Sequence, residues 1–174
     1  MLQMQINPHF LYNTLDIIVW MIENEQKTEA VKVVTALARF FRISLSRGKS
    51  LITVKDELEH VRNYLMIQQM RFKNKFTYTI ESDDEVLELA SLKLMLQPLV
   101  ENSIKHGMQT GHAGGEIHIS IKKVEEHLQV EVGDNGKGIE ETELEKLKRQ
   151  WQEISKDEKE ERRAAGKVGI HNIM

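Results

Sequence analysis

The first 72 residues place apolar side chains at the spacing of an α-helix in three separate stretches. Thr53 followed by Asp56 forms a capping box that predicts the start of the third helix. Three amphipathic helices must cover their apolar faces against each other or against a second chain, so the pattern predicts a helical bundle that forms a homodimer. The predicted faces are Ile6, Phe10, Ile17 and Met21 with Leu11, Leu15, Ile18 and Ile22 beside them; Val31, Val34, Ala38, Phe41 and Leu45; and Val54, Leu58, Val61, Leu65 and Phe72.

After Phe72 the pattern changes to the alternation that is typical of β-strands. Residues 76–80, 117–121 and 128–132 each alternate apolar and polar positions, and the short gap between the last two predicts a hairpin. Residues 92–107 return to helical spacing, and Pro98 predicts a kink or a late start there. The order predicts an α+β fold in which helices cover one face of a mixed sheet. We therefore predict a helical domain at 1–72 and an α/β domain at 73–174.

The composition narrows the classes of function. The 174 residues carry a net charge of −3, so no overall field attracts nucleic acid, and we predict no nucleic-acid partner. The chain has no cysteine, which excludes disulfides, thiolate metal sites and a cysteine nucleophile. No apolar run approaches the roughly 20 residues that span a bilayer, so the chain itself is predicted to be soluble. Because the sequence begins inside a helical pattern, we interpret both of its ends as cuts in a longer protein.

His9 lies in the segment INPHFLYN, directly after Pro8. An imidazole nitrogen that is held exposed and in line can attack the γ-phosphoryl group of ATP. Asn13 follows one helical turn later and can hydrogen-bond near the reacting group. A histidine after a helix-starting proline is also at home as an ordinary solvent-facing side chain, so this segment alone leaves both interpretations open.

Residues 97–107 read QPLVENSIKHG and place three polar side chains on one side of a helix. Asn102, Lys105 and His106 are three and four positions apart. An amide oxygen can complete a Mg²⁺ shell beside phosphate oxygens, and a lysine ammonium supplies a point charge for them. The polar outer face of an ordinary amphipathic helix would give the same pattern.

Two glycine-rich segments follow. In VGDNGKGI, residues 132–139, Asp134 ends a strand and its carboxylate can accept a hydrogen bond from an exocyclic amine, while the glycines let backbone approach a flat ligand. An ordinary Asn-Gly hairpin turn would explain the same letters. In GKVGIHN, residues 166–172, a glycine before a helix start leaves backbone N–H groups free for a phosphate, although a loop glycine is the simpler explanation.

These segments, in this order, resemble the N, G1 and G2 boxes of the GHKL nucleotide-binding superfamily, which includes gyrase, the mismatch-repair protein MutL and the histidine kinases. The INPHFLYN segment resembles the phosphoacceptor box of the LytS/YesM group of histidine kinases. The resemblance covers essentially the whole chain. It implies a helical dimerisation and phosphotransfer segment followed by a GHKL (Bergerat-type) ATP-binding sandwich, incomplete at its C-terminus.

The resemblance also implies a role for each matching residue. His9 would be the phosphoacceptor with Asn13 beside it, and the charged stretch 140–163 would fall in the lid over ATP. Asp134 would hold the adenine amino group, and Asn102 would ligate Mg²⁺. The implied nucleotide-binding residues are Asn102, Lys105, His106, Asp134, Asn135, Gly136, Gly138, Gly169 and Asn172.

The function that the resemblance implies is that of a bacterial two-component sensor histidine kinase. It would phosphorylate itself from ATP and Mg²⁺ and pass the phosphoryl group to an aspartate in the receiver domain of a response regulator. This chain would be the cytoplasmic portion of a protein that is anchored in the inner or plasma membrane through an N-terminal part.

The sequence departs from the family pattern in three places. Phe10 follows His9 where many histidine kinases have an acid, which leaves Glu101 as the nearest candidate for a general base. Lys167 stands where the second glycine box commonly has glycine, and the chain stops at Met174 before the closing strands, so we expect weak ATP binding or none from this chain alone.

Two other functions stay open. A GHKL ATPase would place a water-activating glutamate four residues before Asn102, but this chain has Pro98 there. A non-catalytic helical scaffold is the second alternative.

Overall fold

The computed structural model describes residues 8–45, 50–73, 75–107 and 114–150, with only the backbone at 106 and 107. Contacts along the chain divide it into two compact units, Met1–Lys137 and Gly138–Met174, which are described separately. In the second unit, residues 141–150 are helical, and Leu144 and Leu147 are half-buried there. The rest of the predicted lid, from Trp151 onward, lies outside the described residues.

Three helices open the first unit. They are α1 (Pro8–Glu23), α2 (Lys27–Ser44) and α3 (Val54–Arg71), and each packs against the other two. The Thr53 side chain accepts a hydrogen bond from the backbone N–H of Asp56 at 3.0 Å, so the cap predicted for the third helix is present. Val54, Leu58, Val61 and Leu65 are all buried, which confirms these four positions of the predicted stripe, while Phe72 is half-buried just after the last residue of α3.

The predicted faces of the first two helices were partly wrong. In α2 the buried residues are Ala30, Val33, Ala36, Leu37, Phe40 and Ile43, one position away from the predicted set. Val31, Val34 and Leu45 are 64%, 48% and 57% exposed. In α1, Leu15 and Ile22 are likewise exposed, whereas Thr14 is buried, and its hydroxyl is satisfied there by donating to the carbonyl of Phe10. Both helices are apolar on more than one side, so periodicity alone could not select the inner face.

A three-stranded sheet covers the other side of α3. Its order is β2 (Phe76–Ser82), β4 (Gly115–Val124) and β5 (His127–Asp134), with β2 parallel to β4 and β4 antiparallel to β5. The predicted hairpin joins β4 and β5, with Val124 opposite His127. The inner face consists of Phe76, Tyr78, Ile80, Ile117, Ile119, Ile121, Leu128, Val130 and Val132. The predicted alternation is therefore confirmed in all three strands.

The segment between the strands differs from the single helix predicted at 92–107. Helix α4 begins only at Leu96 and ends at Asn102, and a π-helical turn, η2 (Ser103–Gly107), follows it. Residues Ala90–Leu92 form β3, which pairs antiparallel with β1 (Leu51–Thr53), and a short 3-10 turn, η1, spans Asp84–Val86. Three-residue strands are too short for alternation to reveal. Pro98 lies in the first turn of α4, so the late start that it predicted is present.

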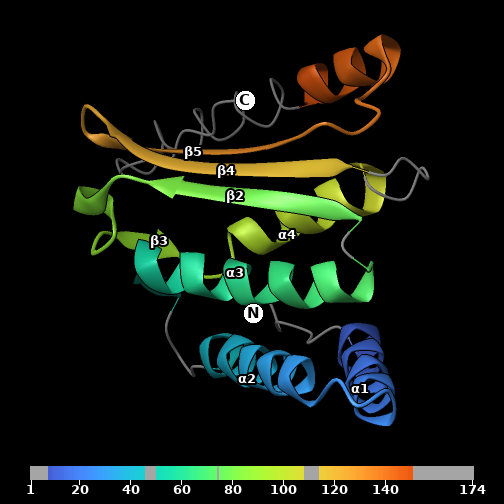
Figure 1. Ribbon diagram of the computed structural model, residues 1–174. Helices are drawn as coiled ribbons and strands as arrows, with labels where there is room; N and C mark the ends of the chain where they lie inside the picture. The colour runs from blue at the N-terminus through green and yellow to red at the C-terminus, as the bar shows by residue number, and fades with distance from the viewer. Residues whose placement is uncertain (1–7, 46–49, 74, 108–113, 151–174) are drawn as a thin grey trace. The chain divides into compact units, whose positions relative to one another are not determined.

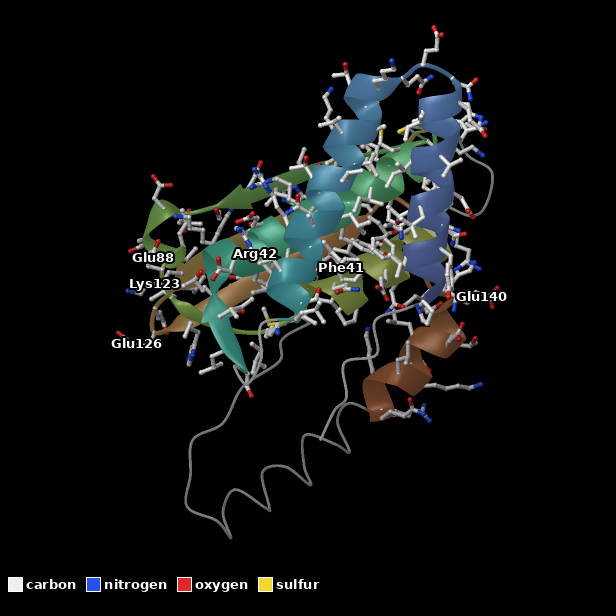
Figure 2. The ribbon with its side chains drawn as sticks, turned by 90° about the horizontal axis from the view of Figure 1, so that it is seen from below. Phe41, Arg42, Glu88, Lys123, Glu126 and Glu140 are labelled. Carbon is white, nitrogen blue, oxygen red and sulfur yellow. The ribbon has the colours of Figure 1, made fainter. Side chains whose placement is uncertain are left out.

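The first unit is layered (Figure 1). Helices α1 and α2 lie on one side of α3, and the sheet lies on its other side with α4 beneath it. Figure 2 views the unit from the helical side, with Phe41 and Arg42 on α2 and with Lys123 and Glu126 at the hairpin end of the sheet. A helical N-terminal segment followed by a mixed sheet with helices confirms the predicted α+β class. The predicted domain boundary at 72 stays a prediction.

Candidate functional site

His9 is the second residue of α1, and its side chain is exposed. The side-chain nitrogen of Asn13 lies 3.1 Å from Nδ1 and 3.2 Å from Nε2 of His9. An amide N–H group at that distance can donate to an unprotonated ring nitrogen and so favour one tautomer. The predicted pair His9 and Asn13 is therefore brought together, one turn apart on the helix surface.

The neighbour of His9 anchors this end of α1. Phe10 is buried, and its ring centroid lies 5.0 Å from that of Phe40 on α2 and 5.2 Å from that of Tyr64 on α3. Aromatic contacts at these distances add to the burial of apolar area. His9 thus points outward from a backbone that its adjacent residue fixes.

The second predicted group lies on α4 and the π turn. Asn102 and Lys105 are exposed, whereas Ser103 and Ile104 between them are buried. A single π turn inside a helix is frequent at functional sites because it re-aims the side chains around it. The His106 side chain lies outside the described residues.

Glu101, the candidate general base, accepts a hydrogen bond from the Gln97 side chain at 2.7 Å. Its charge also raises the pKa of Tyr64, whose main perturbation, in the same direction, is burial. Tyr64 accepts a hydrogen bond from Gln68 at 2.8 Å. Tyr64 therefore contacts Phe10, beside the candidate phosphoacceptor, and is near enough to Glu101 for that charge to act on it. None of the sequence patterns singled out Tyr64, although its place three residues after Val61 on the buried side of α3 was a usable signal.

The third group is the turn after β5. One carboxylate oxygen of Asp134 accepts the backbone N–H of Gly136 at 2.9 Å, and Asp134 is exposed, so its second oxygen can accept from a ligand. The Asn135 side chain accepts the N–H of Glu116 at 2.7 Å and donates to the carbonyl of Gly114 at 3.1 Å. Asn135 thus ties the turn to the start of β4, and its predicted contact with the nucleotide stays a prediction.

The fold brings the second and third groups to one strand. Helix α4 and the π turn both contact β5, which ends at Asp134. Gly138 belongs to the second unit; its φ of 69° lies in the left-handed region that favours glycine, and a Cβ there would meet nothing within 4 Å. Gly169 and Asn172 lie outside the described residues.

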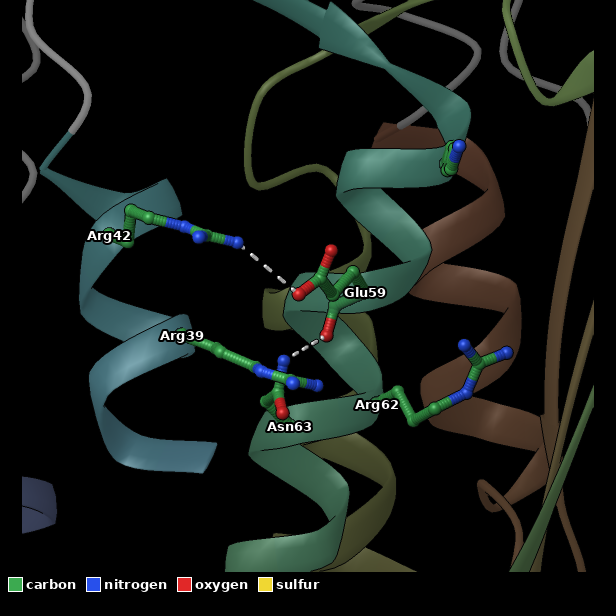
Figure 3. Close-up of a pocket in the computed structure, with 6 residues that line it drawn as sticks. Arg39, Arg42, Glu59, Arg62 and Asn63 are labelled. Carbon is green, nitrogen blue, oxygen red and sulfur yellow. Dashed lines mark hydrogen bonds and ion pairs between the residues drawn. The ribbon is translucent and has the colours of Figure 1, made fainter. Parts of the chain in front are cut away.

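A basic groove of about 420 Å³ lies elsewhere, between α2 and α3 (Figure 3). Arg42 approaches Glu59 to 3.6 Å, and Asn63 donates to the Glu59 carbonyl at 2.8 Å. The groove contains none of the predicted site residues, so it is separate from the three groups above. Its lining residues are Arg39, Arg42, Lys55, Glu59, Arg62 and Asn63.

The described residues contain no group of three histidine, aspartate or glutamate side chains that could hold a metal ion alone. The exposed side chain of Asn102 offers one amide oxygen, and Mg²⁺ usually binds through one or two protein ligands together with waters and substrate phosphates. Within the same residues, no helix is both long and apolar enough to cross a membrane.

Comparisons with known proteins match both parts of the chain. Residues 1–76 match the family "Histidine kinase", and residues 88–172 match the family "Histidine kinase-, DNA gyrase B-, and HSP90-like ATPase". A solved histidine kinase domain from the Erythrobacter litoralis EL346 blue-light activated histidine kinase is 19% identical with a TM-score of 0.43, over 74% of this chain and 67% of that one.

Curated relatives agree with the family models. The chain is 39% identical to the sensor histidine kinase YesM of Bacillus subtilis over 138 residues, which is 79% of this chain and 24% of the relative. It is 38% identical to the sensor protein LytS of Oceanobacillus iheyensis over 141 residues, which is 80% of this chain and 24% of LytS. It is 37% identical to the sensor histidine kinase BtsS of Escherichia coli K12 over 135 residues, 78% and 24% of the two chains.

The chain thus spans about a quarter of the length of the curated relatives that it matches. The two family matches follow each other in the order that the motifs predicted, and the second belongs to ATP-using proteins. On this evidence the chain belongs to the sensor histidine kinase family, in the group of LytS and YesM.

Proposed function

We propose that the protein containing this chain transfers the γ-phosphoryl group of ATP to His9 and then to an aspartate of a response-regulator receiver domain. The observation that carries the proposal is the exposed imidazole of His9 with the Asn13 amide against its ring nitrogens. The same compact unit holds the two polar groups that match a nucleotide site.

The chemistry follows from these positions. An unprotonated nitrogen of His9 attacks the γ-phosphorus, an N–P bond forms, and the P–O bond to ADP breaks. The other ring nitrogen of this neutral imidazole carries the proton and cannot accept a hydrogen bond, so the Asn13 amide nitrogen withdraws from the attacking nitrogen and leaves its lone pair free. In the second step a carboxylate oxygen of the receiver attacks the phosphorus, and the N–P bond breaks to return the imidazole. An exposed His9 is accessible to both reactants.

On the nucleotide side, Asp134 accepts a hydrogen bond from the adenine amino group through the carboxylate oxygen that is not bonded to the N–H of Gly136. Lys105 approaches the phosphates, and Asn102 offers its amide oxygen to Mg²⁺, which would neutralise charge on the phosphate oxygens. Glu101 is the candidate base; the Gln97 side chain donates to one of its carboxylate oxygens, and the other oxygen can take the proton. His106, Gly138, Gly169 and Asn172 remain predicted members of the nucleotide site.

The partner that we propose for the helical segment is a second copy of this chain. Helix α2 exposes Val31 and Val34 away from its buried face, Leu45 directly after the helix is exposed as well, and α1 exposes Leu15, Val19 and Ile22. Apolar side chains grouped on the outer faces of two packed helices are typical of a dimer interface. Val34→Asp should shift the protein to monomers in sedimentation experiments, whereas Val33→Ala, at the fully buried neighbouring position, should lower stability without dissociating the dimer. Anchoring of the whole protein in a membrane also stays a proposal.

The experiment that tests the proposed function is incubation of the full-length protein with γ-labelled ATP and Mg²⁺. We expect label on the protein that is stable in alkali and lost in acid, as a phosphoramidate is, and we expect the label to pass to a receiver domain. Acid-stable label, or label retained after His9→Gln, would contradict the assignment of His9.

Hydrolysis of ATP to drive a clamp is the second candidate function. The position four residues before Asn102 is Pro98, which is exposed in the first turn of α4 and has no group that could activate water. We therefore favour transfer to His9. Phosphate release by His9→Gln at the rate at which the parent is labelled would reverse that preference.

A further inference from the structure

Helix α4, which carries Asn102, begins without a cap of its own. It starts at Leu96 after Met95, and the Met95 side chain makes no capping hydrogen bond. Two residues before the helix, Leu94 has a φ of 60°, in the left-handed region that a bulky residue rarely adopts. A helix start of this kind needs hydrogen-bond acceptors from elsewhere in the molecule.

Glu57 on α3 supplies these acceptors. One carboxylate oxygen accepts the backbone N–H of Leu96 and the other accepts that of Leu94, both at 2.8 Å. The Glu57 side chain is 1% exposed. A carboxylate that accepts N–H groups at a helix start combines the cap with a favourable interaction with the helix dipole. Here the capping residue comes from another helix, 37 and 39 positions earlier in the chain.

A second tie holds the same loop from α2. Lys93 donates through Nζ to the backbone carbonyl of Ser44, the last residue of α2, at 2.9 Å. Its charge also interacts with that of Glu57. The loop at residues 93–96 is thus attached to the ends of two helices of the segment that carries His9. The predicted chemistry uses neither Glu57 nor Lys93.

The position of α4 sets the position of the nucleotide-facing side chains. Asn102 lies six residues after Leu96, about 9 Å along the helix axis, and the π turn with Lys105 continues directly from it. A change in the direction of the helix start therefore moves both side chains. Leu96 and Val100 hold the inner side of α4 in the core, and the cap holds the direction of the first turn of the helix.

We propose that Glu57 is a positioning residue for the nucleotide site, because it caps α4 from α3 and so fixes where Asn102 and Lys105 point. This inference rests on the proposed nucleotide-binding role of α4. It adds a residue of the helical segment to those that determine ATP affinity.

The test compares Glu57→Gln with two matched controls in the full-length protein. Glutamine keeps the shape but offers one acceptor oxygen and turns an NH₂ group toward a backbone donor. Glu59→Gln removes a charge two positions away, where the carboxylate faces Arg42 in the groove (Figure 3). Leu58→Ala removes buried volume from the same turn and leaves the cap in place. ATP affinity is measured by calorimetry with Mg²⁺, and amide hydrogen exchange is followed at Leu94 and Leu96.

We expect Glu57→Gln to weaken ATP binding about tenfold or more, as the loss of a supporting hydrogen bond at a binding site commonly does, and to speed exchange at Leu94 and Leu96. Leu58→Ala should lower the melting temperature without changing ATP affinity, and Glu59→Gln should change neither. If Glu57→Gln does not fold, Glu57→Asp is tested instead, because it keeps the charge but draws both oxygens back by one methylene; it should weaken ATP binding as well.

ATP affinity equal to that of the parent in Glu57→Gln, or in Glu57→Asp where that variant is used, overturns the inference. So does a loss of affinity in Leu58→Ala as large as that in the Glu57 variant, since general destabilisation would then explain both. A parent that binds no ATP overturns the proposed function instead, and unchanged exchange at Leu96 in Glu57→Gln would then also overturn the cap.

Discussion

The two histidines of the helical segment occupy opposite environments. His9 lies exposed at the start of α1 with one side-chain amide beside its ring. His60 lies in the interior between α2 and α3 with no exposed surface, its ring stacked on Phe40 at 4.4 Å and its Nε2 2.8 Å from the Ser44 hydroxyl. The first can meet a phosphoryl donor and a receiver, and the second can meet neither.

The difference shows how the same residue type is used for reaction and for structure. Burial, together with the nearby charge of Lys93, lowers the pKa of His60 from 6.5 to about 4, so the ring stays neutral in the folded protein at neutral pH. Its Nδ1 has no hydrogen-bond partner in the described part of the chain. The His60 ring is therefore held by packing and by one hydrogen bond, whereas the His9 ring is accessible.

The substitution His9→Gln is the most direct test of the difference between the two histidines. We expect it to abolish acid-labile phosphorylation while leaving ATP affinity within about twofold and stability within about 0.5 kcal/mol, since a surface substitution away from caps and cores rarely does more. Labelling with γ-labelled ATP, calorimetry and thermal unfolding check the three parts. His127→Gln, at another exposed histidine, is the control and should leave phosphorylation intact.

His60 should show the opposite profile, with a large effect on stability and its pH dependence. Because its folded pKa is about 4 and its ordinary value is 6.5, the unfolded chain binds the proton first on acidification. The stability that the neutral ring contributes is present above pH 6.5 and is lost as the pH falls toward 4, by roughly 3 kcal/mol. His60→Phe should remove most of this loss in denaturant unfolding between pH 7 and 4.

The protonation of Glu57 changes stability in the opposite direction to that of His60, so the two contributions have to be measured separately. Burial raises the pKa of Glu57 above 4.5, so the folded state holds this proton more strongly than the unfolded chain does, and its protonation on acidification favours folding. Measuring His60→Phe in both the parent and a Glu57→Gln background isolates the histidine, because the two residues lie one turn apart and need not act additively. An unchanged pH dependence in His60→Phe would contradict the buried neutral ring.

The turn after β5 also contains one side chain that can meet a ligand and one that is bonded within the protein. Asp134 has a carboxylate oxygen open to a ligand, whereas the Asn135 side chain bonds to the start of β4. Asp134→Ala should weaken adenine-nucleotide binding tenfold or more without unfolding the domain, because a charge-assisted hydrogen bond is worth about 1.5–3 kcal/mol. GTP has a carbonyl oxygen where ATP has this amino group, so GTP should bind poorly to the parent. Equal affinities for ATP and GTP in calorimetry would rule out the adenine contact.

Asn135→Ala is the matched control for Asp134→Ala. It removes both bonds that tie the turn to Gly114 and Glu116, so it should lower stability by about 1–2 kcal/mol. Its effect on ATP affinity should be smaller than that of Asp134→Ala. The reverse order of affinities would show that Asn135 contacts the nucleotide directly, as the sequence motif predicted.

The sequence predicted those parts of the fold in which one side of an element is clearly polar. The stripe of α3 and the alternation of β4 and β5 are of this kind. It failed on α2, where Val33 and Val34 both lie in apolar rows and only the packed structure shows which row faces inward. Pro98 predicted the late start of α4, but the residue that accepts the N–H of Leu96 is Glu57, 39 positions earlier, and a local pattern cannot identify a partner at that distance.

The candidate site was predicted from motifs rather than from geometry. His9 and Asn13, one turn apart, are brought together as their spacing implied. The sequence patterns did not single out Glu57, although it lies three residues after Val54 and four before Val61 on the buried stripe. They did not single out Tyr64 either, whose ring contacts Phe10 and whose pKa Glu101 raises. A polar residue in phase with an apolar stripe was the available signal.

The smallest expected effect concerns an exposed residue whose backbone conformation is strained. Glu125, in the turn between β4 and β5, has a φ of 54°. A left-handed backbone costs a non-glycine residue roughly 1–2 kcal/mol, while glycine adopts it freely but loses more entropy on folding. Glu125→Gly should therefore raise stability by up to about 1 kcal/mol in denaturant unfolding.

Its neighbour provides the control, because Glu126 shares the turn, the charge and the exposure but does not have a positive φ. Glu126→Gly gains no relief of strain and should lower stability by about 0.5–1 kcal/mol. Opposite signs at adjacent positions would show that backbone geometry, and not the loss of a negative charge, sets the effect. Two changes of the same sign would contradict the role of backbone strain at Glu125.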